Sequence, residues 1–228
     1  MTDSSPVLSE ERAAVADACH RLGAEGLLIG TAGNVSVRVE DHVAITATGA
    51  VLAELTPDQV TVVDLDGEIV AGGLLPTSEL DLHLGVYRRY GTAAVVHTHA
   101  PMATALSLVL DELPCIHYQL LALGGTVRVA PYATFGTPEL AESVLTALEG
   151  RGAALMANHG AVTHAPTLDK AVEHALLLEW ACGVYQHAAA LGQPRILDEQ
   201  QQIAVIEAAL ARDYGTTQSA PSAQEGNR

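Results

Sequence analysis

Lysine is nearly absent from this 228-residue chain, which contains one, Lys170. A mechanism that forms a Schiff base with a lysine amine therefore has a single candidate, and Lys170 lies outside every motif described below. Lysine and arginine together number 11 against 27 acidic residues, which gives a formal net charge of -16. This balance argues against a nucleic-acid partner, because phosphate backbones are bound by clustered Lys and Arg.

Cysteine is also scarce. Cys19, Cys115 and Cys182 are far apart and form no CxxC pair, so neither a disulfide framework nor a cysteine zinc site is predicted. No run of 18 apolar residues occurs, so we expect no segment that spans a membrane. The N-terminal stretch is polar and lacks an apolar signal segment, which predicts a cytoplasmic protein.

Aromatic residues make up only 4% of the chain, whereas apolar residues reach 49%, so Ala, Val and Leu must fill the core. No linker rich in Pro, Gly or Ser divides the middle of the chain. We therefore predict one folded domain over residues 9–215, a flexible N-terminus over 1–8 and a disordered tail over 216–228.

Helices are expected over residues 9–24, 78–90, 167–191 and 198–212, with Ser9 and Ser78 as N-caps of the first two. Between them, alternating apolar residues predict strands, and Asp66-Gly67 predicts the turn of a hairpin. The regular strand–helix alternation of a doubly wound fold is missing. This pattern predicts an α/β or α+β sandwich around a central, mainly antiparallel sheet.

Three histidines each follow an apolar run that reads as a buried strand. His97 and His99 stand two residues apart, and since side chains i and i+2 of a strand share a face, both imidazoles can bind one metal ion. His159, in Asn158-His159-Gly160, leaves another apolar run. Glu79 adds a carboxylate near the start of the helix expected over 78–90. Three histidines and one carboxylate match a four-coordinate zinc site, although cobalt, iron or manganese also accept such ligands.

The other seven histidines have weaker claims, and we expect surface or core positions for them. His83 is one turn beyond Glu79, so it could lie beneath the site.

Small residues dominate three turns in the first third of the chain, at residues 30–34, 48–49 and 77–78. Glycines let the backbone approach a ligand closely, and hydroxyl, amide and backbone N–H groups are donors that a phosphate needs. The start of a helix at 77–78 adds the positive end of its dipole. Each turn alone has an ordinary structural explanation, but together with the metal ligands they predict a phosphate site without a positive side chain.

Seven short motifs occur in order along the chain: GTAGNVSVR (30–38), TATG (46–49), PTSE (76–79), HTHAP (97–101), IHY (116–118), APYATFGT (130–137) and NHG (158–160). Together they resemble the class II aldolase and epimerase family, and the similarity runs from about residue 10 to Tyr214. The resemblance implies a three-layer α/β/α sandwich around a nine-stranded antiparallel sheet. It also implies a four-fold symmetric homotetramer with active sites between adjacent subunits.

The resemblance further implies roles for individual residues. Zn2+ is the expected cofactor, bound by His97, His99, His159 and, in the resting state, Glu79, which is also the catalytic acid/base. Tyr118 is expected to reach the neighbouring subunit's site and handle the proton at the aldehyde oxygen. Tyr214 is expected near the substrate as a C-terminal tyrosine, and Phe135 is expected at the aldehyde end. The phosphate is expected to be bound by Asn34, Thr48, Gly49, Thr77 and Ser78.

The activity implied by the resemblance is reversible retro-aldol cleavage of L-fuculose 1-phosphate, or a related short ketose 1-phosphate, to dihydroxyacetone phosphate and an aldehyde such as L-lactaldehyde. A 5-deoxypentulose-1-phosphate aldolase, a methylthioribulose-1-phosphate dehydratase and a non-catalytic interaction domain like that of adducin stay open as alternatives. The family's epimerase carries Asp where this chain has Glu79, which favours the aldolase. Non-catalytic members are expected to lose the zinc ligands, whereas this chain keeps them.

Overall fold

The structure is a computed structural model that describes residues 7–217. The flexible segment predicted at the N-terminus and the disordered tail predicted at the C-terminus lie mostly outside this range, and the domain boundaries stay predictions. Within residues 7–217, no helix is both long and apolar enough to cross a membrane.

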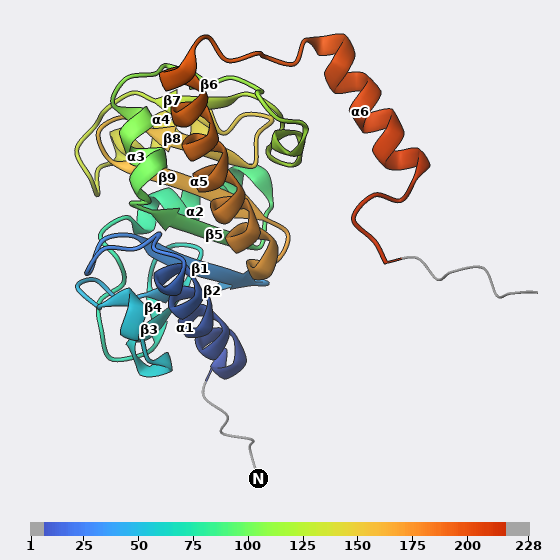
Figure 1. Ribbon diagram of the computed structural model, residues 1–228. Coiled ribbons are helices and arrows are strands. Elements are labelled where there is room, and N and C mark those ends of the chain that lie inside the picture. The colour runs from blue at the N-terminus through green and yellow to red at the C-terminus, as the bar shows by residue number, and fades with distance from the viewer. Residues whose placement is uncertain (1–6, 218–228) are drawn as a thin grey trace, which may run out of the picture.

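Nine strands form one central sheet in the order β4-β3-β2-β1-β5-β9-β8-β7-β6 (Figure 1). Every neighbouring pair is antiparallel except β7 and β8, which run parallel, so the predicted mainly antiparallel sheet is confirmed. The strands are β1 (Asn34–Val39), β2 (His42–Thr46), β3 (Val60–Asp64), β4 (Ile69–Ala71), β5 (Ala94–Thr98), β6 (Glu112–Leu113), β7 (Val127–Ala130), β8 (Ala153–Met156) and β9 (Gly160–Ala165).

Helices cover both faces of this sheet. On one face pack α1 (Ser9–Ala24), α3 (Pro101–Ser107) and α5 (Leu168–Leu191), and on the other pack α2 (Leu80–Tyr90) and α4 (Pro138–Ala147). Strand residues divide between two apolar cores by alternation, since Ala94 and Val96 belong to the first and Val95 to the second. The predicted three-layer α/β/α sandwich is therefore confirmed.

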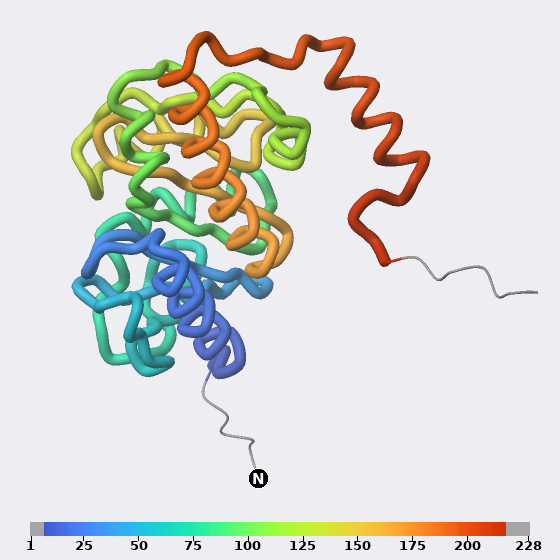
Figure 2. The backbone as a smooth tube through the Cα atoms, in the orientation of Figure 1, coloured from blue at the N-terminus to red at the C-terminus, as the bar shows by residue number. Residues whose placement is uncertain are grey.

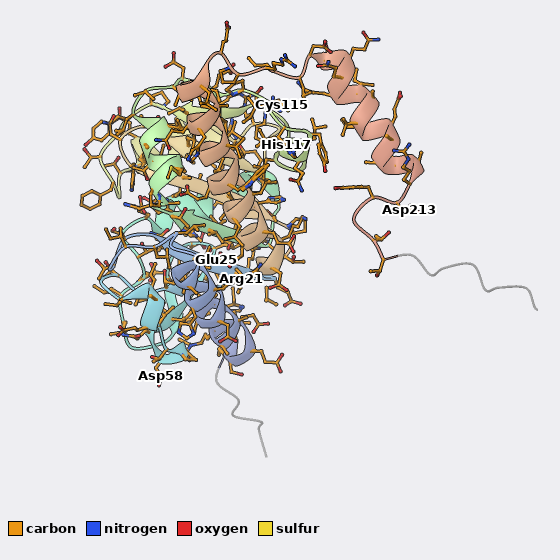
Figure 3. The ribbon with its side chains drawn as sticks, in the orientation of Figure 1. Arg21, Glu25, Asp58, Cys115, His117 and Asp213 are labelled. Carbon is orange, nitrogen blue, oxygen red and sulfur yellow. The ribbon has the colours of Figure 1, made fainter. Side chains whose placement is uncertain are left out.

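The last helix, α6 (Glu199–Ala211), lies outside these layers, and the tube in Figure 2 shows the long segment that leads to it. It has no buried residue, and it packs beside the 3-10 helix η3 (Tyr118–Leu123). In Figure 3, His117 marks the residue before η3 and Asp213 marks the chain shortly after α6. The helix begins at a capping box, in which Asp198 and Gln201 each bond the other's backbone N–H.

Two predicted N-caps were wrong by one residue each. The N-cap of α1 is Leu8, and Ser9 is the first helical residue. The N-cap of α2 is Glu79 instead of Ser78. The cause lies just before α2, because Pro76 pairs with Ala47 and the N–H of Thr77 bonds the carbonyl of Thr46. The chain must turn away from β2 before the helix can begin.

Candidate active site

Strand pairing brings the three histidines together. β5 and β9 are antiparallel neighbours with Thr98 opposite Ala161, so the end of β5 meets the start of β9. His97 is within β5, His99 follows it, and His159 comes directly before β9. Their ring centroids lie 4.8 to 4.9 Å apart, and one ring nitrogen of each falls within 4.8 Å of the others.

Gly160 permits this close approach. A Cβ atom at position 160 would lie 2.3 Å from the carbonyl oxygen of Thr98, which is far inside van der Waals contact. Any side chain here would push β9 away from β5 and carry His159 away from His97. The glycine of the Asn158-His159-Gly160 motif is thus required by the packing of the two strands.

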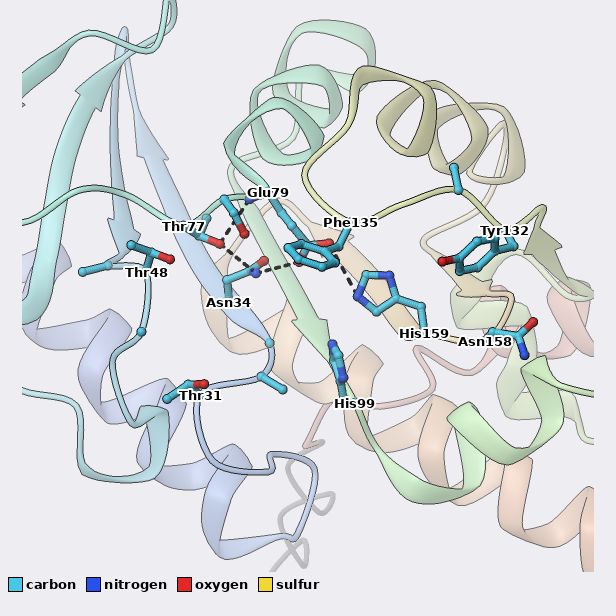
Figure 4. Close-up of a pocket in the computed structure, with 16 residues that line it drawn as sticks. Thr31, Asn34, Thr48, Thr77, Glu79, His99, Tyr132, Phe135, Asn158 and His159 are labelled. Atoms are coloured by element: carbon cyan, nitrogen blue, oxygen red, sulfur yellow. Dashed lines mark hydrogen bonds and ion pairs between the residues drawn. The ribbon is translucent and has the colours of Figure 1, made fainter.

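Glu79 completes the cluster from the opposite side (Figure 4). Its Oε2 lies 3.1 Å from Nε2 of His97, and its Oε1 lies 3.6 Å from Nε2 of His159. The carboxylate is buried at the N-terminus of α2, where the helix dipole favours negative charge. The structure therefore brings together all four residues that the sequence suggested as metal ligands.

The charges in this cluster are set by burial and by mutual contacts. Burial acts to raise the pKa of Glu79, but His97 and the amide of Asn34 outweigh it and hold this pKa well below its usual range. Burial and the neighbouring imidazoles lower the pKa of His99 to about 4, and they lower that of His159 as well. His99 and His159 are therefore neutral near pH 7 and have a lone pair to offer a metal ion.

The donor set fits a divalent cation. Nδ1 of His97 lies 2.9 Å from the carbonyl oxygen of Ala161 and donates to it, which leaves Nε2 facing the cluster. Burial acts to lower the pKa of His97, but the carboxylate of Glu79 outweighs it and raises this pKa, so a metal ion would take the place of a proton on Nε2. That Nε2 is only 3.1 Å from Nε2 of His99. Among the described residues, the buried Oε1 of Glu79 has no hydrogen-bond partner. Converging lone pairs and a partnerless carboxylate oxygen are what a bound cation would satisfy, so His97, His99 and His159 could hold a metal ion.

A buried polar network continues beneath Glu79. The amide nitrogen of Asn34 lies 2.8 Å from Oε2 of Glu79 and 3.0 Å from Oγ1 of Thr77. Its amide oxygen lies 2.5 Å from Nε2 of His83, which is fully buried. Burial lowers the pKa of His83, the charge of Glu79 acts to raise it, and the charge of His97 acts to lower it. The pKa falls to about 3, so this imidazole is neutral. The expectation that His83 could lie beneath the site agrees with this position.

A cavity of about 430 Å3 opens beside the cluster, and Figure 4 shows the side chains around it. The predicted phosphate residues all lie on its wall. Thr48 and Thr77 come from segments joined by backbone hydrogen bonds, from Thr48 to the carbonyl of Leu75 and from Thr77 to that of Thr46. The cavity is lined by Thr31, Ala32, Gly33, Asn34, Ala47, Thr48, Gly49, Thr77, Ser78, Glu79, His99, Tyr132, Ala133, Phe135, Asn158 and His159.

No lysine or arginine appears among these lining residues. Lys170, the chain's one lysine, lies on α5 and pairs with Glu173 at 2.9 Å. A phosphate in this cavity would therefore meet hydroxyl, amide and backbone donors. Both amide hydrogens of Asn34 are already engaged with Thr77 and Glu79 in this structure, so a contact from Asn34 to phosphate requires one of them to exchange.

The predicted aromatic residues divide into two groups. Phe135 lines the cavity, whereas Tyr118 and Tyr214 lie elsewhere. The hydroxyls of Tyr118 and Tyr214 are 3.0 Å apart, and both residues line a separate cavity of about 530 Å3 between η3, α5 and α6. A single chain thus does not bring these tyrosines to its own histidine cluster. A role for either at such a site requires a second subunit.

Sequence reasoning missed Tyr132 as a residue of the site. It lines the cavity beside Phe135 and is largely exposed. A signal was present, because Tyr132 and Phe135 belong to one motif in a loop after a strand. Thr31 and Asn158 also line the cavity, and both stand inside motifs that the sequence singled out for other residues.

A three-layer sandwich that carries three histidines and a carboxylate beside a cavity of neutral donors has the architecture of a metal-dependent aldolase. The model of the family described as "Class II Aldolase and Adducin N-terminal domain" matches residues 13–186. Curated relatives agree. One is an L-fuculose phosphate aldolase of Escherichia coli K12, 39% identical over 194 residues, which covers 84% of this chain and 90% of the relative.

Two further comparisons give the same result. A 5-deoxy-D-ribulose 1-phosphate aldolase of Bacillus thuringiensis serovar kurstaki is 36% identical over 198 residues, with coverage of 86% and 93%. A solved structure of an L-fuculose 1-phosphate aldolase superposes with a TM-score of 0.86 at 34% identity, over 90% of this chain and 98% of that one. The chain therefore belongs to the class II aldolase family and is an enzyme of the lyase class, as the resemblance in the sequence implied.

Metal retention tests the cluster directly. After loading with Zn2+ and dialysis, we expect the wild-type protein to keep about one ion per chain, and His99→Ala to keep less than about a tenth of that amount, because one ligand of a four-coordinate site is lost. Metal is counted by mass spectrometry on folded protein. His187→Ala is the matched control, since His187 lies exposed on α5 and bonds the carbonyl of Gly183. Equal retention by the two variants would remove His99 from the metal site.

Proposed function

We propose that this protein catalyses the reversible retro-aldol cleavage of L-fuculose 1-phosphate, or a related short ketose 1-phosphate, to dihydroxyacetone phosphate and an aldehyde. The observation that carries the proposal is the placement of Glu79, His99 and His159 on the wall of a cavity that is also lined by neutral hydrogen-bond donors. The names of the curated relatives support the substrate class, because L-fuculose phosphate and 5-deoxyribulose 1-phosphate are both ketose phosphates that end in a methyl group.

The phosphate anchors the substrate and sets the register of the sugar. Backbone N–H groups and hydroxyls at the turns 48–49 and 77–78 donate to its oxygens, and the amide of Asn34 contributes when it exchanges partners. Binding energy from this remote group holds the reacting carbons near the histidine cluster. Phe135 lies on the cavity wall, and we assign it to the aldehyde end of the substrate.

Glu79 moves the proton at the reacting carbon. Cleavage of the C3–C4 bond releases the proton of the C4 hydroxyl and leaves an electron pair on C3. Glu79, which is ionised in the resting site, takes up one proton from solvent and delivers it to C3 to give dihydroxyacetone phosphate, so one proton is lost and one is gained. Its Oε1 has no hydrogen-bond partner among the described residues, whereas Oε2 is held by Asn34, so Oε1 is the oxygen free to exchange a proton. We assign Zn2+ to His97, His99, His159 and resting Glu79; when bound, it supplies a Lewis acid for the substrate oxygens on which negative charge develops.

Tyr118 completes the site from a neighbouring chain in a homotetramer. We propose that Tyr118 of the partner subunit accepts the proton of the C4 hydroxyl during cleavage while its own hydroxyl proton passes to solvent, and that Tyr214 lies near the substrate at the same interface. The side chains of Tyr118 and Tyr214 are exposed on the single chain, and their hydroxyls are hydrogen-bonded to each other. The exposed apolar side chains of α6, Ile203, Ile206 and Leu210, also suit burial between subunits. The cytoplasm is the location we propose, as predicted from the sequence.

Product analysis tests the proposed reaction. The zinc-loaded protein is given L-fuculose 1-phosphate, and dihydroxyacetone phosphate is followed through NADH oxidation by glycerol-3-phosphate dehydrogenase. We expect release that chelation abolishes and added Zn2+ restores. A 5-deoxypentulose 1-phosphate, which gives acetaldehyde, is assayed in parallel to rank the substrates. Formation of a diketone phosphate from methylthioribulose 1-phosphate, without any triose from these ketose phosphates, would replace the aldolase by the dehydratase.

Hybrid tetramers test the shared site. Glu79→Gln and Tyr118→Phe are each expected to lose activity, the first by about 10²–10⁴-fold because the proton donor is gone. In a mixed tetramer, a Tyr118→Phe chain beside a Glu79→Gln chain has one site with both groups intact. Random exchange of equal amounts should restore about a quarter of wild-type turnover if each site uses one neighbour.

The double variant Glu79→Gln/Tyr118→Phe mixed with Glu79→Gln is the control, because no site in that mixture has an intact Glu79. Absence of recovery in the first mixture, after subunit exchange is verified by mass spectrometry, would mean that Tyr118 does not act across an interface.

A further inference from the structure

His83 belongs to a chain of buried side chains that ends at Glu79. The hydroxyl of Tyr87 lies 2.5 Å from Oγ of Ser36, which lies 2.6 Å from Nδ1 of His83. On the other side of the ring, Nε2 lies 2.5 Å from Oδ1 of Asn34, and Nδ2 of Asn34 lies 2.8 Å from Oε2 of Glu79. All five side chains are buried. The reaction proposed above assigns no part to His83, Ser36 or Tyr87.

Because the buried ring of His83 is neutral, donor and acceptor capacities allow only one arrangement of protons along this chain. The carboxylate of Glu79 only accepts, so the NH2 group of Asn34 must face it and the amide oxygen must face His83. Because an amide oxygen also only accepts, His83 carries its proton on Nε2. Nδ1 of the neutral ring is then the acceptor of the proton of Ser36, and Ser36 accepts from Tyr87.

This arrangement fixes the amide of Asn34. A rotated amide would place its oxygen against the carboxylate of Glu79 and its NH2 group against the N–H of His83, which replaces two attractions by two repulsions. His83 is itself held in place, because it lies one turn after Glu79 on α2 and packs with 0% exposure. The ring therefore decides which face of Asn34 meets Glu79.

We propose that His83 is a positioning residue: through Asn34, it fixes the carboxylate of Glu79 so that Oε2 is held and Oε1 stays free. The kinetic consequence of this inference rests on the proposed function, in which Glu79 is the acid/base, but the placement itself does not. Ser36 and Tyr87 serve the same end, because they keep Nδ1 of His83 as an acceptor.

Two substitutions at position 83 separate positioning from simple filling of space. In His83→Gln the side-chain amide reaches as far as Nε2 did and can still donate to Asn34. In His83→Asn the amide ends near the former Nδ1 and can meet only Ser36. For His83→Asn we expect kcat to fall about tenfold, as for loss of one buried hydrogen bond, while KM stays within about twofold of wild type. For His83→Gln we expect kcat to stay at about half the wild-type value or more. Equal losses in the two folded, metal-loaded variants would overturn the proposal.

A double-mutant cycle tests whether His83 acts through Asn34. In an Asn34→Ala background the link to Glu79 is already cut, so His83→Asn should lower kcat no further. Effects on kcat that multiply in full would show that His83 acts by another route and would overturn the proposal. If His83→Asn gives no folded protein, Ser36→Ala replaces it in the same cycle, because it removes the donor to Nδ1 with a smaller change of volume.

Crystal structures of the two variants without substrate give a readout that does not depend on activity. We expect the amide of Asn34 and the carboxylate of Glu79 to move in His83→Asn, and to keep their wild-type places in His83→Gln. Unchanged positions in both variants would overturn the proposal. If the wild-type protein released no dihydroxyacetone phosphate, the proposed function would fail, while these structures would still decide the role of His83.

Discussion

The antiparallel pairing of β5 with β9 is the constraint on which the site depends. It sets the end of one strand against the start of the other, and so it converts two motifs that are 60 residues apart in the sequence into one cluster of imidazoles. Gly160 allows the two backbones to meet, and Asn158, with a φ of 56°, lets the chain turn sharply enough between β8 and β9 for His159 to face His97. A second attachment, of residues 76–77 to the end of β2, brings Glu79 to the same point.

Local donors, and not overall charge, make this site suitable for an anionic substrate. The chain carries a formal net charge of -16, yet the cavity wall offers hydroxyls, backbone N–H groups and an amide, and none of the described residues that line it is a lysine or an arginine. Positive charge at the reacting end would come from a metal ion held by neutral imidazoles. The same buried surroundings that lower the pKa of His99 keep its lone pair available, so burial prepares the cluster for a cation.

The sequence predicted what local periodicity encodes and missed what tertiary contacts decide. The spacing of His97 and His99, and the apolar runs before the three histidines, were enough to group the candidate ligands. The strands β6 and β7 have two and four residues, which are too few for alternation to be visible. The helix α4 was not predicted, although an N-cap Thr137 followed by a proline marks its start in the sequence. The network through His83 joins residues almost 50 positions apart, and the contact between Tyr118 and Tyr214 spans 96, so only the folded chain reveals them.

We propose that His97, His99, His159 and Glu79 form one metal site at the junction of β5, β9 and α2. Anomalous scattering at the zinc absorption edge, measured on crystals of the zinc-loaded protein, tests it most directly. We expect a single strong peak per chain, about 2.0–2.2 Å from Nε2 of the three histidines and from an oxygen of Glu79. A peak at another place, or none between these side chains in a zinc-loaded crystal, would show that these four residues do not form the metal site.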